Sequence, residues 1–405
     1  MKCEVLNFTF LFNDMRKSVC LFLIVVIVAL GCWVAERWNV WFAKHPEPPF
    51  QLTESVVGVQ LTVGNNPLTE RIVSWRSRPD SALLKDNAVR LIWISDADTL
   101  YPKVNKKWIK SGGGEAIYYW SEVAVQEGEY CYAIETLEAP QKLSTIDSIL
   151  SIDSIVFKTP YYKTSVNYSD SLQLLILGDL QDKTQNPETD SVVLQLAKDY
   201  NPDFILQLGD LIDRPHQDKW DIYFHSFEPL RTIFPIVSIV GNHDYHKGLN
   251  KYPDERFFYT FPYFLDNENN APNIGCCELS FGATYLYIID SNQPIWMHIK
   301  QRKWLINRLQ SLGESDSKII AMHHPLRSAR SKFNNLIVRL MYENVVKKHN
   351  IGLVLAGHEH TNYTLTEEET GGYKQIITNF SFKNYEKNKG EKGRKPIFLT
   401  LPINL

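Results

Sequence analysis

The chain falls into three parts by its pattern of apolar and polar residues. Between residues 51 and 160, short segments alternate apolar and polar positions or are rich in β-branched and aromatic residues. Turn signals such as GNNP, RPD and SGGG separate these segments. Six or seven strands within about 110 residues are typical of an antiparallel β-sandwich, so we predict an all-β domain here.

From Ser171 the pattern changes to continuous apolar runs that end in polar motifs. Segments with helical periodicity, such as TDSVVLQLAKDY, IKQRKWLINRLQSL and NNLIVRLMYENVVKKHN, lie between most of these runs. Apolar strands that alternate with amphipathic helices indicate sheets covered on both faces, and the loops after the strand carboxyl ends then carry the chemistry. We therefore predict an α/β domain at 171–405, a sandwich at 46–160 that begins with a stiff spacer (PEPPF), and a linker at 161–170.

Residues 1–45 are predicted to be a signal sequence or a membrane anchor. The stretch from Ser18 to Ala35 carries no charge and follows Arg16 and Lys17. Its length is near the lower limit for a helix that spans a bilayer, and a short apolar run behind basic residues is also a signal-peptide pattern. Either interpretation places the rest of the chain outside the cytoplasm, because basic residues stay on the cytoplasmic side.

Several alternatives for this segment stay open. Four aromatic residues resemble the belt at a membrane interface and favour an uncleaved anchor, through which a membrane would be a partner. They are Trp33, Trp38, Trp41 and Phe42. Cys32 follows Gly31, which loosely matches a lipoprotein cleavage site. The apolar run could also be a buried core helix. Met15 is a second candidate for the first residue of the protein.

Composition narrows the class of protein. The chain of 405 residues is 44% hydrophobic and 22% charged, which excludes wholesale disorder. Its net charge is −3, so the chain has no excess of basic residues, and we expect no nucleic acid as a binding partner. Six cysteines in this length exclude a disulfide-dense scaffold, and the absence of a CxxC pair argues against a structural zinc site.

Five of the apolar runs end in side chains that bind metals. The motifs are Gly178-Asp179, Gly209-Asp210, Gly241-Asn242-His243-Asp244, His323-His324-Pro325 and Gly357-His358-Glu359-His360. A single GD or HxH is a weak signal, but five such motifs, each behind an apolar strand, are hard to obtain by chance. Carboxylate, amide oxygen and imidazole suit first-row metals such as Fe, Mn or Zn, and one carboxylate can bridge two cations. We therefore predict two metal ions that clamp a phosphoryl group.

The order GD, GDxxD, GNHD, HHP and GHxH resembles the block pattern of the calcineurin-like metallophosphoesterases, over residues 171 to about 385. A sandwich followed by such a domain resembles the purple acid phosphatase arrangement, in which a fibronectin-III-like domain precedes the catalytic one. The resemblance implies an enzyme that hydrolyses phosphoesters, in which a hydroxide between two metals attacks phosphorus. A phosphodiesterase with the same site, or a weakened metal-binding relative, is the alternative.

The resemblance also implies six metal ligands around one shared carboxylate. Asp210 would bridge the two metals, and Asp179 and His360 would complete the first metal site. The second metal would also be bound by Asn242, His323 and His358.

The GNHD motif and two departures from the family pattern concern the remaining site residues. His243 would contact the phosphate or protonate the leaving oxygen, and Asp244 would orient His243. Gln181 stands where many relatives have His. Either its amide oxygen is a weak metal ligand, or the first metal has one ligand fewer. Asp213 stands where purple acid phosphatases have the Tyr that colours their iron, so the purple chromophore is expected to be missing. Asp213 is then a replacement ligand or a loop or capping residue.

Substrate contacts are predicted on three further residues. A monoesterase needs extra positive groups, for which the candidates are His324, Arg327 and Arg330, although charged residues there can also be solvated surface. A diesterase needs room that the aromatic stretch at 256–264 would line, unless it packs as core or as a lid. The Lys-rich segment 383–396 is predicted to be a flexible loop before a last strand, with attraction of anionic substrate or lipid headgroups as a further hypothesis.

Overall fold

The computed structural model describes residues 19–38 except 30, 33 and 37, and residues 45–402 with short gaps. The gaps are 138–154, 168–170, 182–183, 185–186, 249–250, 266–270 and 384–387. The chain forms two compact units, one of residues 1–45 and 246–252 and the other of residues 46–245 and 253–405. In the first unit, the helix Val19–Glu36 has a mean hydropathy of 2.7 and is long and apolar enough to cross a membrane. A signal sequence near the N-terminus would have the same length and hydropathy.

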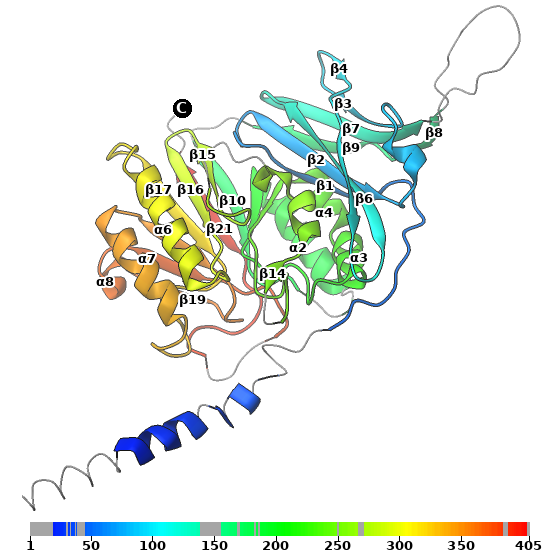
Figure 1. Cartoon of the computed structure of the whole chain (residues 1–405). Coiled ribbons are helices and arrows are strands. Elements are labelled where there is room, and N and C mark those ends of the chain that lie inside the picture. The colour runs from blue at the N-terminus through cyan, green and yellow to red at the C-terminus, as the bar shows by residue number, and fades with distance from the viewer. Residues whose placement is uncertain are drawn as a thin grey trace, which may run out of the picture. The chain divides into compact units, whose positions relative to one another are not determined.

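The N-terminal part of the second unit is a sandwich of two antiparallel sheets (Figure 1). The first sheet has the order β1 (Val57–Val63), β2 (Glu70–Ser77), β6 (Glu115–Ala124) and β5 (Asn105–Lys110). The second has the order β4 (Thr99–Leu100), β3 (Val89–Ile94), β7 (Gly128–Leu137) and β8 (Ile155–Lys158), with β9 (Tyr162–Val166) also paired to β7. Side chains of both sheets share one core, in which Trp75 stacks on Tyr119 with ring centroids 5.5 Å apart. The alternating segments of the sequence therefore form the two-layer fold expected of them.

The segment predicted as a linker requires a correction. Residues 162–166 form β9 and run antiparallel to β7, from Tyr162 beside Tyr132 to Val166 beside Gly128. Tyr162 also packs against Tyr132, with ring centroids 5.3 Å apart. The segment YKTSV is too polar to be recognised as a strand from its sequence. It forms a strand because its backbone pairs with β7.

The C-terminal part contains two mixed sheets. The first has the order β12 (Ile236–Ser238), β11 (Phe204–Gln207), β10 (Ser171–Leu177) and β21 (Ile397–Pro402), with β21 antiparallel to β10 and the others parallel. The second has the order β15 (Cys277–Phe281), β16 (Thr284–Ile289), β17 (Ser317–Met322), β18 (Leu353–Ala356), β20 (Lys374–Ile377) and β19 (Tyr363–Leu365). In this sheet β16, β17, β18 and β20 are parallel. The α/β class predicted for this region is confirmed.

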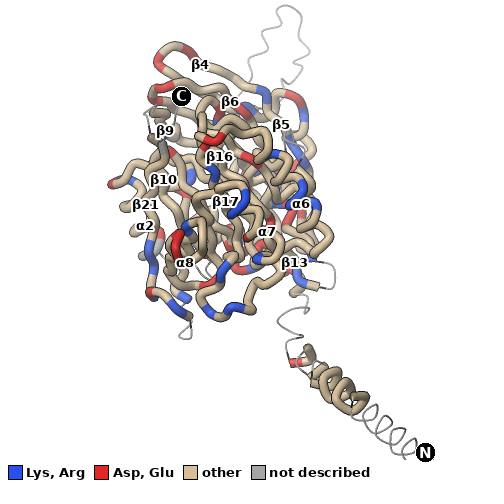
Figure 2. Tube along the Cα trace, turned by 90° about the vertical axis from the view of Figure 1, so that its left-hand side faces the viewer, with Lys and Arg blue, Asp and Glu red and all other residues tan. Residues whose placement is uncertain are grey.

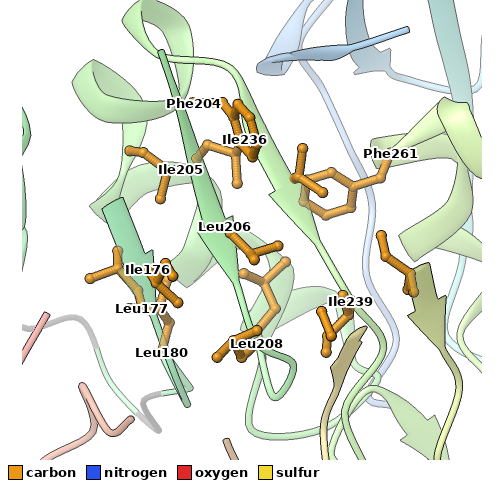
Figure 3. Close-up of a cluster of buried hydrophobic side chains, with 14 of the residues drawn as sticks. Ile176, Leu177, Leu180, Phe204, Ile205, Leu206, Leu208, Ile236, Ile239 and Phe261 are labelled. Atoms are coloured by element: carbon orange, nitrogen blue, oxygen red, sulfur yellow. The ribbon is translucent and has the colours of Figure 1, made fainter. Parts of the chain in front are cut away.

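Apolar side chains on the facing sides of the two sheets form the main core. Figure 3 shows side chains of β10, β11 and β12 gathered in this core, with Phe261 reaching toward them from the end of a helix. On the outer side of the second sheet, α6 (Ile295–Leu309) and α7 (Leu336–Lys348) bury Leu305 and Tyr342 against Tyr287. The remaining helices and short elements are α2 (Pro187–Tyr200), α3 (Gln217–Ser226), α4 (Glu228–Ile233), α5 (Glu255–Thr260), α8 (Glu367–Thr370), η1 (Ser81–Leu84), η2 (Pro262–Phe264), β13 (Tyr245–His246) and β14 (Tyr252–Pro253).

The sandwich is fastened to the α/β part by buried hydrogen bonds. The Tyr132 hydroxyl donates to the carbonyl of Thr232 at 2.7 Å, and the Thr62 hydroxyl donates to the carbonyl of Ile236 at 2.6 Å. Both contacts join a strand of the sandwich to the first sheet or its covering helix. A buried polar group that loses its partner is costly, so these contacts fix the two parts to each other.

The segments predicted as a stiff spacer and as a flexible loop both contact the α/β part. In the predicted spacer, the buried carboxylate of Glu47 pairs with Arg256 at 2.5 Å and accepts from the backbone nitrogen of Gln217 at 2.6 Å. In the described part of the Lys-rich segment, the backbone nitrogen of Lys389 donates to Ala329 at 2.9 Å. Both segments are therefore docked on the α/β part, and the predicted last strand, β21, closes the first sheet.

The aromatic stretch at 256–264 is part of the core. Phe257, Phe261 and Tyr263 are buried in the main apolar cluster, and the Tyr263 hydroxyl hydrogen-bonds with the backbone of Ser238. The hypothesis that these residues line a substrate pocket is therefore wrong. Packing of large aromatic rings against the sheet explains their density here.

Candidate metal centre

The predicted ligands meet at one end of the two sheets. Parallel strands deliver the residues that follow their carboxyl ends to the same edge, which places Asp179 after β10, Asp210 after β11 and His323 after β17. Ligand atoms within 4.8 Å of one another form two clusters. The clusters are Asp179, Asp210 and His360, and Asp210, His323 and His358. Asp210 belongs to both, which is the arrangement predicted for a bridging carboxylate.

The backbone at these positions adopts a conformation that L-residues avoid. Among the described residues other than glycine, eight have a positive φ, and four of these are asparagines. The other four are Asp179 (52°), Asp210 (56°), His358 (72°) and His360 (49°). A left-handed backbone at a non-glycine residue stores strain, and such strain gathers at functional sites. Because these four residues are all predicted ligands, their strain is consistent with selection for ligand geometry.

Glycine precedes four of the six predicted ligands, and at two of these positions a side chain would have no room. A Cβ added to Gly209, where φ is 84°, would lie 2.6 Å from Nδ1 of His323. A Cβ added to Gly241 would overlap the backbone nitrogen and the carboxylate of Asp210. The backbone at a tightly packed ligand cluster leaves no room for side chains at these two positions. The Gly209-Asp210 and Gly241-Asn242 pairs of the sequence therefore reflect crowding around Asp210 and His323.

Hydrogen bonds orient the three donors of the second cluster. The Nδ1 atom of His323 lies 2.9 Å from the carbonyl of Leu208, so Nδ1 carries the proton and Nε2 turns inward. Nε2 lies 3.2 Å from Oδ1 of Asp210 and 3.1 Å from Oδ1 of Asn242. His358 places Nδ1 at 2.8 Å from the same Asn242 oxygen. Burial disfavours the charged ring, but the Asp210 carboxylate outweighs burial and raises the pKa of His323 to about 9.

The first cluster contains buried oxygen atoms that no described group satisfies. Oδ1 of Asp179 accepts a hydrogen bond from the backbone nitrogen of His358 at 3.0 Å, while Oδ2 is buried with no partner among the described residues. Gln181 is fully buried and donates to Oδ2 of Asp210 at 3.2 Å, and its own Oε1 is likewise unsatisfied. Burial raises the pKa of Asp179 to about 8, with the nearby Asp210 carboxylate adding to the effect. A cation bound by Asp179, Asp210 and His360 would satisfy Oδ2 of Asp179, so the donor set fits a metal.

The structure corrects the predicted partner of His243. Nδ1 of His243 lies 2.6 Å from the backbone carbonyl of Asp213, and its backbone nitrogen donates to Asp210 at 2.8 Å. The Asp213 side chain pairs with Arg214 at 3.1 Å and with Lys383 at 3.4 Å, and it joins neither ligand cluster. Asp213 therefore positions His243 through its backbone, and the prediction of a replacement ligand finds no support in this geometry.

Asp244, which we predicted to orient His243, has a different task. Its buried carboxylate accepts hydrogen bonds from the backbone nitrogens of Gly241 at 2.7 Å and Asp210 at 3.0 Å. It also accepts from Leu211 at 3.1 Å and Ile212 at 3.3 Å. Burial, together with the Asp210 charge, raises the pKa of Asp244 to about 7. Asp244 therefore holds the loop after β11, and with it the strained backbone of the shared ligand.

The three predicted substrate contacts differ in outcome. Arg327 pairs with Glu343 at 2.6 Å and donates to the carbonyls of Glu369 and Thr370, so its role is structural and the prediction is corrected. His324 lies with its ring centroid 4.1 Å from that of His358, inside the site. Arg330 is exposed, and its positive charge acts on His358. His324 and Arg330 therefore remain candidates.

Sequence reasoning missed two groups that hold the histidines. The Ser291 hydroxyl lies 2.9 Å from Nδ1 of His324 and accepts from the His324 backbone nitrogen at 2.9 Å. Ser291 follows the end of β16, which is a signal that could have been used. The carbonyl of Leu208 has no such signal, because a backbone acceptor leaves no mark in the sequence.

Comparison with known proteins places this geometry in a family context. Residues 172–362 match the family model described as calcineurin-like phosphoesterase. A probable cyclic nucleotide phosphodiesterase of Moraxella catarrhalis is 26% identical over 194 residues, covering 43% of this chain and 64% of that protein. The Fe(3+)-Zn(2+) purple acid phosphatase 12 of Arabidopsis thaliana is 22% identical over 278 residues, covering 61% of this chain and 58% of that protein.

A solved structure shows the same fold. The purple acid phosphatase PPD1 from yellow lupin seeds superposes with a TM-score of 0.63 over 80% of this chain and 64% of that chain, at 14% identity. At this identity the likeness concerns the fold alone. The chain spans less than two thirds of the length of each of these three proteins.

Proposed function

We propose that this chain hydrolyses phosphoesters at a centre of two metal ions, because residues 172–362 match the family model described as calcineurin-like phosphoesterase. One observation carries the proposal: Asp210 is shared by two clusters of ligand atoms that each span no more than 4.8 Å. One carboxylate between two sets of donors is what a pair of cations needs in order to act on one phosphoryl group. The purple acid phosphatase of Arabidopsis thaliana supports this proposal, because its name gives an Fe(3+)-Zn(2+) pair.

The donor set fits metals, and the residues divide between the two positions. Asp179 and His360 would hold one ion, Asn242, His323 and His358 would hold the other, and Asp210 would contact both. When bound, two cations lower the pKa of a coordinated water and neutralise charge on the phosphoryl oxygens. Oxygen and imidazole donors are compatible with Fe, Mn or Zn.

His243 is the group we assign to proton transfer. Its Nδ1 is occupied by the carbonyl of Asp213, which fixes the ring and leaves Nε2 for the substrate. A protonated imidazole held in this way can give a proton to the departing alkoxide of the ester. Asp244 does not touch the substrate in this proposal, because its carboxylate is occupied by backbone nitrogens of the ligand loops.

Phosphomonoesters are the substrate class that the surroundings favour. His324 lies inside the site, and the charges of Arg330 and Lys383 act on His358 and His360. Positive groups around a metal centre suit the dianion of a monoester. The packing of Phe257 and Phe261 in the core removes the residues that we had considered for a diester substituent. A phosphodiesterase and a metal-binding relative without turnover remain the alternatives that the assay below separates.

Two parts of the proposal concern the rest of the chain. We propose that the sandwich is fibronectin-III-like, which its two antiparallel sheets support. We also propose that the helix Val19–Glu36 is a retained anchor that places the site outside the cytoplasm, which its hydropathy and the preceding basic residues support.

Two substitutions test the activity. Asp210→Asn removes the shared carboxylate, and His323→Ala removes a donor of the second cluster. We expect either variant to lose turnover of p-nitrophenyl phosphate by more than 1,000-fold, on the order of the loss of a metal's contribution, with unchanged circular dichroism. Asp96→Asn, an exposed turn residue of the sandwich, is the matched control and should keep full activity. Near-normal turnover in either site variant would overturn the proposal.

A further inference from the structure

A cavity of about 190 Å³ between the HHP loop and α7 is lined by cations. Its basic side chains are Arg327, Arg330, Lys332, Arg339 and Lys389, and Ser328 and Ser331 add hydroxyl groups. No carboxylate lines it among the described residues. Such a volume accommodates a phosphate group with its hydration, and its lining has the donors that phosphate prefers.

The positive charge of this cavity is only partly neutralised. Glu343 pairs with Arg327 at 2.6 Å and with Arg339 at 2.8 Å, so one carboxylate serves two guanidinium groups. Within the described part of the chain, no ion pair joins Lys332 or Lys389 to a carboxylate. The cavity therefore retains a field that attracts an anion.

Large apolar side chains stand exposed directly beside these cations. Phe333 is 70% exposed, and in the first turns of α7 Ile337 is 52% and Leu340 is 69% exposed. The neighbouring helix α6 exposes Trp296 and Ile299 in its own first turns. The two helices lie side by side, since the Arg302 guanidinium donates to the carbonyl of Met341 at 3.0 Å, and Figure 2 shows Lys and Arg along both.

Acidic residues are missing from both segments. Neither α6 (Ile295–Leu309) nor residues 326–341 contain an Asp or a Glu, whereas they contain four basic residues each. Exposed Trp, Phe and Leu combined with Lys and Arg are typical of proteins that lie on anionic membranes. The acidic residues Glu367–Glu369 of α8 are exposed at the edge of this surface.

We propose that residues 326–341 and the first turns of α6 dock on an anionic lipid bilayer, with a lipid phosphate in the basic cavity. Phe333, Ile337 and Leu340 then enter the boundary between headgroups and acyl chains, and Lys332 and Lys389 face the phosphate. The helix Val19–Glu36 agrees with this occupant, because it is long and apolar enough to cross a membrane. The proposal does not depend on phosphoester hydrolysis.

A second copy of the chain fits this surface less well than a bilayer. A two-fold contact would bring the same patch from each subunit together, and the cations of both would face each other. A bilayer with anionic lipids instead supplies phosphate for the cavity and hydrocarbon for the apolar side chains at once. The experiment below nevertheless separates these occupants.

The test uses the full chain reconstituted in vesicles, with a protease site inserted at 39–44. Cleavage separates the folded part from the helix after it has folded, and flotation measures how much of the released part stays on the vesicles. We expect at least fivefold more retention on phosphatidylcholine with 30% phosphatidylglycerol than on phosphatidylcholine alone, and loss of retention in 0.5 M NaCl. Inorganic phosphate at 10 mM, as a free-phosphate competitor, should reduce retention by no more than half, because the apolar contacts remain.

Two pairs of variants assign the contact to this surface. Phe333→Ser with Leu340→Ser removes apolar contacts, and Lys332→Gln with Lys389→Gln removes charge from the cavity. Each pair should lower retention at least threefold, whereas Leu100→Ser with Phe157→Ser, at exposed positions of the sandwich, should not change it. Equal release from both vesicle types, or retention that neither pair affects, would overturn the proposal. A released part that is dimeric until Phe333 and Leu340 are replaced would also overturn it, in favour of a second copy.

Discussion

The backbone carbonyl of Asp213 lies 2.6 Å from Nδ1 of His243 and fixes the orientation of the imidazole ring. The same residue uses its side chain elsewhere, in an ion pair with Lys383 at 3.4 Å. Because a backbone carbonyl only accepts hydrogen bonds, it holds the proton on Nδ1 and leaves Nε2 as the reactive nitrogen. Asp213 thus links a proton-transfer candidate to a cation at the edge of the site.

Replacement of His243 should separate chemistry from metal binding. We expect His243→Ala to lower kcat for p-nitrophenyl phosphate by about 100- to 10,000-fold, the usual contribution of a general acid. The metal content should stay unchanged, because His243 belongs to neither ligand cluster. Asp213→Asn is the control, since it keeps the carbonyl that orients the ring. A His243→Ala enzyme with normal kcat would show that the ring has no part in the reaction.

Substitution of Gly241 should empty the site without touching a ligand. A Cβ at this position overlaps the backbone nitrogen and carboxylate of Asp210, so Gly241→Ala must displace the shared ligand. We expect elemental analysis to find less than half of the normal metal content in a folded protein. Gly352→Ala is the matched control, because a Cβ there meets no atom within 4 Å. A full metal complement in Gly241→Ala would contradict the claim that a side chain at this position displaces Asp210.

Lys383 should discriminate between ester classes. Its positive charge acts on Asp179 and His360, which places it beside the first cluster. We expect Lys383→Met to raise KM for p-nitrophenyl phosphate roughly tenfold, which corresponds to the free energy of one charge-assisted hydrogen bond. The change in kcat should be smaller. For the monoanionic bis-p-nitrophenyl phosphate the change in KM should be less than threefold. Lys392→Met, which removes an exposed lysine of the same segment, is the control, and equal effects on both esters would contradict this role.

Glu343 should make the stability of the protein depend on pH in the acidic range. Burial raises the pKa of Glu343, but hydrogen bonds and charge from Arg339 and Arg327 outweigh it and hold this pKa below the ordinary 4.5. The unfolded chain then takes up the proton first, so the stabilisation is complete above pH 4.5 and is lost as the pH falls through the lower folded value. Glu343→Gln should lower the free energy of unfolding by about 1–3 kcal/mol at pH 7. Urea unfolding should show this difference shrinking toward pH 3, and a constant difference would contradict the assignment.

Much of the fold was visible in the sequence because burial dictates residue type. Strand β11 is buried along its whole length and β10 along its last four residues, so both appear in the sequence as apolar runs, and the ligands follow where those runs end. Strand β9 and the docking of Glu47 were missed, because both depend on partners far away in the chain. A polar strand or a buried carboxylate carries no local signature until its partner is known.

The candidate site was predictable in its residue types and less so in its contacts. The five motifs contain all the side chains of the two clusters, including the shared Asp210. The contacts of Asp244 and Asp213 could not be predicted, because Asp244 accepts from backbone nitrogens of other loops and Asp213 positions His243 through its own backbone carbonyl. Arg327 was misassigned for a related reason, since its partner Glu343 lies on a helix that follows later in the chain.

The most direct test of the account measures metal content and turnover on the same sample. The full chain, purified in detergent without chelator and supplied with Mn, Zn or Fe, would be analysed for metal beside hydrolysis of p-nitrophenyl phosphate and bis-p-nitrophenyl phosphate. The geometry around Asp210 predicts about two metal ions per chain and preferential turnover of the monoester. A protein that binds no metal after supplementation, or that binds two ions and hydrolyses neither ester, would contradict the central claim.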